Sequence, residues 1–259
     1  MDIKAYARKI YTRLPVPLRA AALWASRPQN LRPVLGPLTY NQDGLATRHN
    51  ADFMKDPDFA RAYGAGWETG SWDGPLHWRL HVILWAAARA AAIPGDFVEC
   101  GVNKGGFSRA VIEYLDFGGM ARTFWLLDTF QGLAGSQLSE CERARGITAG
   151  GYEECWDAVI RTFAPFPNVT LVRGMVPDTL ARVTAPNVAY LSVDMNCAEP
   201  EIAALEFFWP RLSSGAVVVL DDYGWKKHIE QKQAHDAFAR KKGVPLLSLP
   251  TGQGLIIKP

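Results

Sequence analysis

The sequence has few cysteines and no long apolar run, and each shortage excludes a class of protein. Four cysteines occur in 259 residues, and no two of them form a C-x-x-C pair. A zinc site or a disulfide framework is therefore not expected, and reduced thiols suit a cytoplasmic protein. No apolar stretch is long enough to span a bilayer, so no transmembrane segment is expected. The cysteines are Cys100, Cys141, Cys155 and Cys197.

An excess of charge of one sign is also missing. The chain carries 28 Lys and Arg against 26 Asp and Glu, a formal net charge of +2. Nucleic-acid-binding domains usually carry a basic stripe with interleaved aromatic residues. This sequence has no such stripe, so nucleic acid is not an expected partner. The hydrophobic content of 48% is sufficient for the core of one α/β domain.

The N-terminal part differs from the rest of the chain. We expect residues 1–74 to form a helical and loop extension, and residues 75–259 to form the main domain. The apolar stretch from Leu14 to Trp24 is broken by prolines, so it lacks the core of a signal peptide. The extension is predicted to be a cap, or an arm that joins the subunits of a homo-oligomer. A peripheral membrane contact is the alternative.

The most informative stretch is a glycine turn between a strand and a helix. Phe97–Cys100 has strand character, and Gly105 and Gly106 then open a segment of helical periodicity. Such a turn places backbone N–H groups and a helix N-terminus at the carboxyl end of a strand. Its sequence, ECGVNKGG, fits neither G-x-G-x-x-G nor a P-loop. It suits a cofactor without phosphates, such as S-adenosylmethionine (SAM), although glycine at such turns can also serve packing alone.

Three further apolar runs of strand character each end in acidic residues. If the strands are parallel, their carboxyl ends meet at one edge of the sheet, where ligands bind. We therefore expect the acids to share one crevice, with the first of them accepting hydrogen bonds from both ribose hydroxyls of the cofactor. The runs are Thr123–Leu127, followed by Asp128; Val188–Val193, followed by Asp194; and Ala216–Leu220, followed by Asp221 and Asp222.

Carboxylates that converge on one site repel each other unless a cation or hydrogen-bond donors balance them. Asp194, Asp221 and Asp222 match a hard divalent ion, most naturally Mg²⁺. Such an ion can hold two neighbouring hydroxyls of a sugar or catechol and favour deprotonation of one beside the methyl donor. The alternative is that Asp221 caps the next helix or bonds to backbone while Asp222 faces solvent.

The remaining pattern alternates strands with helices and closes with two short runs around a glycine-containing turn, Leu246–Leu249 and Leu255–Ile257. This order predicts a Rossmann-like α/β fold of the class I methyltransferase type. It has a seven-stranded, mostly parallel sheet, a C-terminal antiparallel hairpin and helices on both faces. The expected helices include Asp52–Tyr63, Pro75–Ala92, Tyr152–Phe163, Glu199–Trp209 and His228–Lys241.

Three features leave alternatives open. The long connection Thr129–Gly150 is a substrate lid or a disordered insertion. Trp67 and Trp72 are core residues or a stacking wall for a sugar. In HWRLH, two histidines lie on one helical face, which is half of a metal site. No third ligand has a zinc-like spacing, so contacts with substrate or cofactor are favoured for His77, Arg79 and His81.

Three segments, FVECGVNKGGFS, FWLLDTFQGL and LSVDMNCAEPEIAALEFFWPRLSSGAVVVLDDYGW, resemble the macrocin O-methyltransferase (TylF/MycF-type) family, which methylates deoxysugar hydroxyls. The resemblance covers about Gly95 to Trp225. It implies a class I fold, SAM as methyl donor, Mg²⁺ and a homo-oligomer. By position, it implies metal binding by Asp194, Asp221 and Asp222, with Asp194 also a candidate general base. It implies SAM binding by Glu99, Gly101, Gly105, Ser108 and Asp128.

The chain departs from the family pattern after the first metal-site aspartate. Family members often continue with an Asp-Leu-Tyr-type run, whereas this chain has Met195, Asn196, Cys197 and Ala198. The expected function is Mg²⁺-dependent O-methylation of a sugar, in a glycoside or a polysaccharide precursor. A catechol-type O-methyltransferase and a non-catalytic scaffold with the same fold are the alternatives. A metal-dependent hydrolase is disfavoured because no His-rich or two-metal arrangement is present.

Overall fold

The computed structural model describes residues 37–259. Residues 42–45 and 52–259 form one large unit, and the described residues 37–41 and 46–51 belong to a second one. Residues 1–36 of the expected N-terminal extension lie outside the described residues, and the division of the chain at residue 74 stays a prediction. Each described helix is too short or too polar to cross a membrane.

A small two-stranded sheet precedes the main fold, made of β1 (Tyr40–Gln42) and β2 (Leu45–Thr47). Asp43 and Gly44 between the strands have positive φ angles of 50° and 72°, as the tight turn of a hairpin requires. The Asp-Gly pair is a hairpin signal in the sequence, but the strands are too short to show alternation.

The main sheet has seven strands in the order β5-β4-β3-β6-β7-β9-β8. The strands from β5 to β7 in this order are parallel, and β9 is antiparallel to both of its neighbours. The predicted fold class is confirmed, including the C-terminal antiparallel hairpin. The strands are β3 (Asp96–Cys100), β4 (Phe124–Asp128), β5 (Val169–Arg173), β6 (Val188–Val193), β7 (Leu212–Leu220), β8 (Leu247–Ser248) and β9 (Gly254–Ile257).

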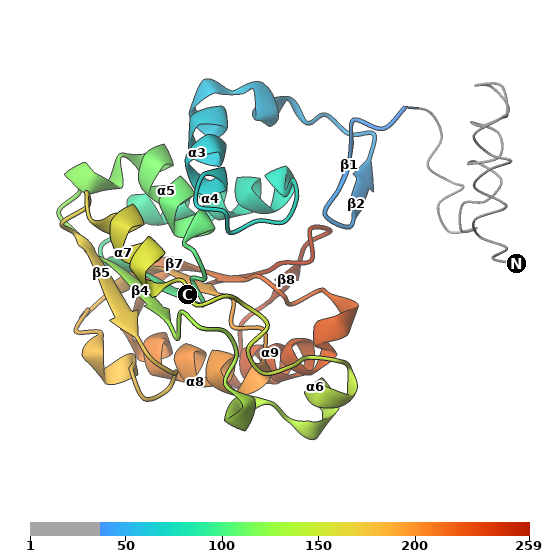
Figure 1. The fold of residues 1–259 in the computed structure, drawn as a ribbon, viewed down its shortest axis with the longest axis vertical. Helices are drawn as coiled ribbons and strands as arrows, with labels where there is room; N and C mark the ends of the chain where they lie inside the picture. The colour runs from blue at the N-terminus through green and yellow to red at the C-terminus, as the bar shows by residue number, and fades with distance from the viewer. Residues whose placement is uncertain (1–36) are drawn as a thin grey trace, which may run out of the picture. The chain divides into compact units, whose positions relative to one another are not determined.

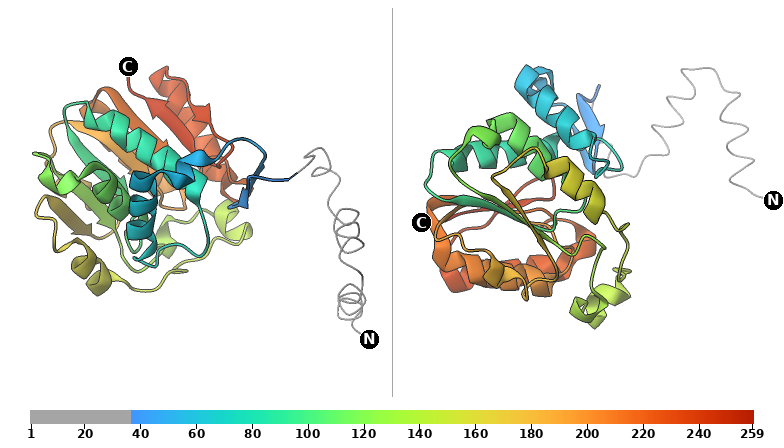
Figure 2. Two further views of the ribbon diagram at one scale, coloured as in Figure 1. Left: turned by 90° about the horizontal axis from the view of Figure 1, so that it is seen from above. Right: turned by 60° about the vertical axis from the view of Figure 1, so that its left-hand side comes forward.

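Helices cover both faces of this sheet (Figures 1 and 2). Alternate residues of a strand point to opposite faces, so Phe97 of β3 packs in one core cluster and Val98 in the other. Residues of α3, α4, α5 and α7 contribute to the first cluster and so cover one face of the sheet, and residues of α8 and α9 contribute to the second cluster on the other face. The helices are α3 (Pro57–Trp67), α4 (His77–Ala91), α5 (Gly106–Leu115), α6 (Glu140–Ala144), α7 (Trp156–Phe163), α8 (Ala198–Phe208) and α9 (Ile229–Lys242).

Helix α3 begins later than the predicted helix Asp52–Tyr63. Residues 52–55 form a separate 3-10 turn, and the carboxylate of Asp56 accepts hydrogen bonds of 2.9 Å from the N–H groups of Asp58 and Phe59. This is an N-cap followed by proline at the first helical position, a strong helix start. The cap, rather than the apolar periodicity, sets the boundary.

The long connection between β4 and α7 is folded rather than featureless. It contains α6, which begins with a capping box between Ser139 and Glu142. Leu138 and Ile147 form a small buried cluster with Cys197. Helix α7 begins at Trp156 and not at Tyr152 as predicted, because residues 151–155 continue the connection.

Gly101, the first residue after β3, is a point of close backbone approach. Its φ is +91°, and a Cβ atom added there would lie 1.8 Å from the backbone oxygen of Asp194. We predict that Gly101→Ala lowers the free energy of unfolding by well over the about 1–2 kcal/mol that a left-handed residue costs by itself. Urea unfolding measures this.

Gly243→Ala is the matched control, because Gly243 has a φ of +67° but no atom within 4 Å of an added Cβ. Equal losses in the two variants would contradict the close approach at Gly101.

Candidate functional site

A cavity of about 420 Å³ lies at the carboxyl ends of the parallel strands. Five of the predicted site residues line it, namely Glu99, Gly101, Asp128, Asp194 and Asp222. Its volume falls in the range of small-molecule sites. The glycine turn and the acidic strand ends therefore face one space, as the parallel topology predicts.

The carboxylate of Asp128 organises the turn after β3. Its Oδ2 accepts hydrogen bonds from the N–H groups of Val102 (2.6 Å) and Asn103 (2.7 Å), and its Oδ1 accepts one from Phe130 N (2.6 Å). The Thr129 hydroxyl also donates to Oδ1 at 3.3 Å, so each carboxylate oxygen has two donors, and the bond from Thr129 is the longest of the four. A contact between Asp128 and ribose stays a prediction.

Glu99 is a buried acid beneath the turn, and the Ser108 hydroxyl donates a hydrogen bond to it. Burial, with the nearby charges of Asp221 and Asp128, raises the pKa of Glu99 well above its ordinary value. Of the five residues predicted to bind SAM, Ser108 and Gly105 do not line the cavity. Ser108 supports Glu99 from behind, and a Cβ on Gly105 would collide with the Phe163 ring.

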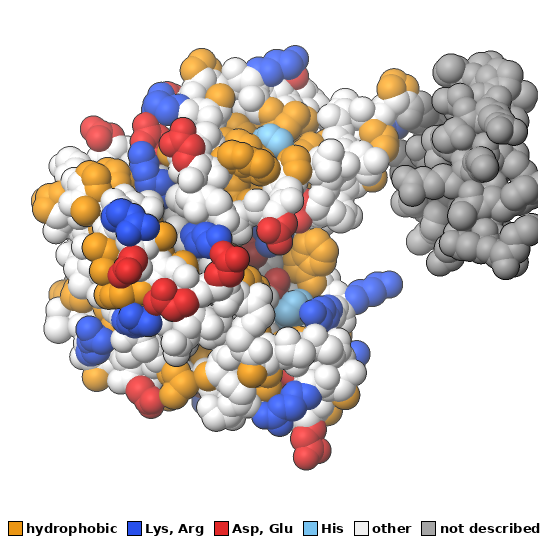
Figure 3. Space-filling model, viewed as in Figure 1, with side chains coloured by type: hydrophobic (Ala, Val, Ile, Leu, Met, Phe, Trp, Pro, Cys, Tyr) orange, Lys and Arg blue, Asp and Glu red, His pale blue; other side chains and the backbone are white. Residues whose placement is uncertain are grey.

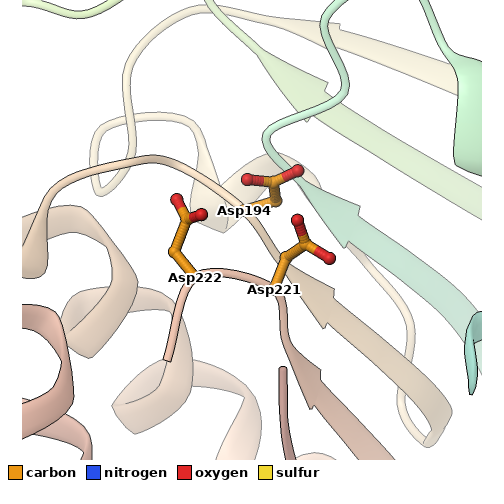
Figure 4. Close-up of side chains that lie close together, drawn as sticks. All are labelled: Asp194, Asp221 and Asp222. Atoms are coloured by element: carbon orange, nitrogen blue, oxygen red, sulfur yellow. The ribbon is translucent and has the colours of Figure 1, made fainter. Parts of the chain in front are cut away.

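Asp194, Asp221 and Asp222 converge at the ends of β6 and β7 (Figure 4). One carboxylate oxygen from each can be chosen so that all three lie within 4.8 Å of one another. Within residues 37–259 this is the only group of three or more His, Cys, Asp or Glu with such geometry. The structure thus brings together the three predicted metal ligands, while their role in binding a metal stays a prediction.

Burial and mutual repulsion act on this cluster. Burial, followed by the charges of Asp221 and Asp222, raises the pKa of Asp194 well above its ordinary value. Burial, followed by the charge of Asp221, raises the pKa of Asp222 to about 8. Asp222 Oδ2 is buried without a hydrogen-bond partner among the described residues. An unpartnered buried carboxylate oxygen and an all-oxygen donor set fit a hard divalent cation.

Arg79 of α4 provides positive charge to one member of the cluster. Its Nη1 lies 2.6 Å from Asp221 Oδ2, and its Nη2 lies 2.8 Å from Asp43 Oδ1. Gln253 donates a 2.9 Å hydrogen bond to the other oxygen of Asp221. Burial opposes the charge on Arg79, but the two aspartates raise the pKa of its guanidinium above the ordinary value. Of the described residues that line the cavity, Arg79 is the only Lys or Arg.

The two histidines of HWRLH lie apart from the acidic cluster. His77 stacks on Tyr63 with 4.1 Å between ring centroids, and His81 stacks on Phe53 at the same distance. Neither lines the cavity, whereas Arg79 and Trp72 do. The histidines therefore belong to an aromatic cluster beside α3, and Trp72 remains a candidate wall for a ligand.

Several polar residues of the site carry no signal in the sequence. Tyr152 and Asn196 both line the cavity. Burial, followed by the charges of Asp194 and Asp222, raises the pKa of Tyr152 to about 12, so its hydroxyl keeps its proton at neutral pH. Acidic and basic side chains are interspersed on the face of the molecule shown in Figure 3.

The sequence profile of the macrocin-O-methyltransferase (TylF) family matches residues 78–247, which is more than half of the chain. The chain is 32% identical over 145 residues to 8-demethyl-8-(2,3-dimethoxy-alpha-L-rhamnosyl)-tetracenomycin-C 4'-O-methyltransferase of Streptomyces olivaceus, covering 52% of this chain and 55% of that protein. It is 28% identical over 144 residues to mycinamicin III 3''-O-methyltransferase of Micromonospora griseorubida, covering 51% and 56%. The matches thus span about half the length of these curated relatives.

Among solved structures, the O-methyltransferase NovP superposes with a TM-score of 0.63 at 22% identity, covering 81% of this chain and 99% of NovP. A calicheamicin methyltransferase superposes with a TM-score of 0.56 at 17% identity, covering 90% and 98%. At these identities the likeness concerns the fold alone.

The ion pair between Arg79 and Asp221 is largely buried, and we predict that Arg79→Met is strongly destabilising. Removing one partner leaves a buried charge uncompensated, which costs about 3–5 kcal/mol. Chemical denaturation measures this.

Arg61→Met is the matched control, because the ion pair of Arg61 with Asp58 is exposed and such pairs contribute about 1 kcal/mol or less. If both variants lose the same stability, the assignment of Arg79 as the counter-charge of the cluster is wrong.

Proposed function

Because the chain belongs to the macrocin O-methyltransferase family, we propose that it is a SAM-dependent, Mg²⁺-assisted O-methyltransferase acting on a sugar with neighbouring hydroxyls. The observation that carries this proposal is the convergence of Asp194, Asp221 and Asp222, two of which, Asp194 and Asp222, line the same cavity as the glycine turn. The printed activities of the relatives, which include a rhamnosyl 4'-O-methyltransferase, support a sugar acceptor.

The residues of the glycine turn would hold the cofactor. Glu99, Gly101 and Asp128 line the cavity, and Asp128 offers carboxylate oxygens toward which ribose hydroxyls can donate. SAM, when bound, supplies an electrophilic methyl group on a sulfonium. Asn103 and Trp72 also line this space and would enclose the nucleoside.

The acidic residues would hold the cation and the acceptor. Asp194, Asp221 and Asp222 are the residues that would bind Mg²⁺, which supplies Lewis-acid activation of a neighbouring hydroxyl. Asp194 lines the cavity, and its carboxylate is the candidate acceptor of the hydroxyl proton. Tyr152 and Asn196, at the same end of the cavity, can orient a polar acceptor by hydrogen bonds.

A catechol-type acceptor is the second candidate, since a catechol also offers two neighbouring hydroxyls. Adjacent Asp221 and Asp222 favour the sugar, because catechol O-methyltransferases usually have Asp-Asn at this place. Incubation with methyl-labelled SAM, Mg²⁺ and either a deoxysugar glycoside or a catechol compares the two. Labelled methyl ether formed on the catechol alone would overturn the sugar assignment. Absence of binding heat with both SAM and Mg²⁺ would favour a non-catalytic scaffold.

We predict that Asp222→Asn abolishes Mg²⁺-dependent turnover while SAM affinity is kept. The amide keeps the size of the side chain but removes the charge, and the loss should exceed the about 10- to 100-fold that removal of an outer hydrogen-bonding partner costs. Titration calorimetry with SAM and with Mg²⁺, together with turnover, measures these effects. Asp157→Asn, at an exposed position of α7, is the control. Unchanged Mg²⁺ affinity in Asp222→Asn would refute the metal site.

The thermal stabilisation that Mg²⁺ provides should increase with pH. The pKa of Asp222 is raised from 3.8 to about 8, so its contribution to stability without a cation is lost as pH rises through about 8. Mg²⁺ competes with this proton, and its affinity should therefore rise between about pH 6 and pH 9. The measurement is the difference in unfolding midpoint between Mg²⁺ and EDTA. A difference that stays constant or falls with pH would contradict the prediction.

A further inference from the structure

A second group of buried polar side chains lies behind the acidic cluster and is centred on Glu201. Glu201 is in the first half of α8 and is 1% exposed. Its Oε1 accepts hydrogen bonds of 2.8 Å from Met195 N and from Gln231 Nε2. Its Oε2 lies 3.1 Å from His235 Nε2. Glu201, Gln231 and His235 do not line the cavity, so none of these three side chains is placed to touch a ligand.

A buried carboxylate at this position costs free energy, and packing of the apolar core does not require one. α8 and α9 enclose an apolar core cluster that contains Ala204, Leu205 and Phe238, and an aliphatic side chain would suit that environment. Burying a charge is unfavourable unless it is hydrogen-bonded and paired. The partners of Glu201 are therefore the informative feature.

One of the two hydrogen-bond donors to Oε1 leads directly to the acidic cluster. Met195 directly follows Asp194, so its bond to Glu201 fixes the backbone where β6 ends. Asn196, the next residue, has a positive φ of 58°, so the chain turns sharply directly after β6. Gln231, from α9, donates to the same oxygen of Glu201. Glu201 thus joins the end of β6, directly after Asp194, to both α8 and α9.

We propose that Glu201 is a positioning residue that fixes the backbone where β6 ends, and thereby the position of Asp194 and the affinity of the site for Mg²⁺. His235 Nε2 lies near the second oxygen of Glu201 but forms no hydrogen bond with it. This inference rests on the proposed Mg²⁺ site, and it adds residues that the metal does not touch.

The test measures Mg²⁺ affinity, SAM affinity and unfolding in the full-length protein by titration calorimetry and thermal unfolding. Glu201→Ala should weaken Mg²⁺ binding by about 10- to 100-fold and leave SAM affinity unchanged. Glu201→Gln should restore Mg²⁺ affinity to within a few-fold of wild type, because its amide oxygen still accepts both hydrogen bonds. A Glu201→Gln variant as weak as Glu201→Ala would overturn positioning and point to the charge itself.

Glu206→Ala is the matched control. Glu206 also lies on α8 and links it to α9, through Lys241 at 2.7 Å and Lys242 at 2.6 Å, but it contacts none of the three aspartates. Mg²⁺ affinity should not change in this variant. An equal weakening in Glu206→Ala and Glu201→Ala would mean that helix packing, and not positioning by Glu201, sets the affinity.

Two further results keep the outcomes separate. If Glu201→Ala does not fold, Gln231→Leu removes one of the two hydrogen bonds to Glu201 Oε1 and should still weaken Mg²⁺ binding; wild-type affinity there would overturn the proposal. A wild-type protein that binds no Mg²⁺ would overturn the proposed function and this inference with it. Wild-type binding combined with unchanged binding in Glu201→Ala would overturn the inference alone.

Discussion

Repulsion among three carboxylates held at the ends of two neighbouring parallel strands is the constraint on which the site depends. The sheet brings one carboxylate oxygen of each of Asp194, Asp221 and Asp222 within 4.8 Å of the others, and the largely buried guanidinium of Arg79 pairs with Asp221. Charge of this density in a partly enclosed space is stable only with protons or further cations. The raised pKa values of Asp194 and Asp222 show that the site favours neutralisation of its carboxylates. In the state that carries out the proposed reaction, a divalent ion would supply the balancing positive charge.

The cofactor turn and the acidic cluster are also joined mechanically. Asp194 N donates a 2.8 Å hydrogen bond to Cys100 O, which directly precedes the turn. Gly101 then approaches the backbone of Asp194 so closely that no side chain fits. A methyl donor held by the turn and an acceptor held at the acids would therefore have a separation set by the pairing of β3 with β6. Such fixed geometry is the main contribution that a protein can make to a displacement between two bound partners.

The sequence alone predicted the sheet and the convergence of the acids, because the residues that follow parallel strands all lie at one edge of the sheet. It was not sufficient for the neighbours of those acids. Gln253 lies in a turn 32 residues after Asp221, and Glu201 meets His235 across two helices. Such contacts depend on how α4, α8 and α9 pack, which periodicity does not specify. The start of α3 is different, since the Asp56-Pro57 pair is a local signal that apolar periodicity alone overlooked.

The connection between β4 and α7 favours a fixed wall over a lid that opens. Glu142 Oε1 accepts a 2.8 Å hydrogen bond from Ala198 N at the start of α8, while Oε2 accepts one from Ser139 N at the start of α6. Arg145 forms a 2.7 Å ion pair with Glu230 at the start of α9. The wall is thus fastened to the two helices that also carry Glu201 and Gln231. Because the same helices support the wall and the acids, acceptor selection would come from side chains on a rigid frame, and a change in the wall would be transmitted to the geometry of the acids.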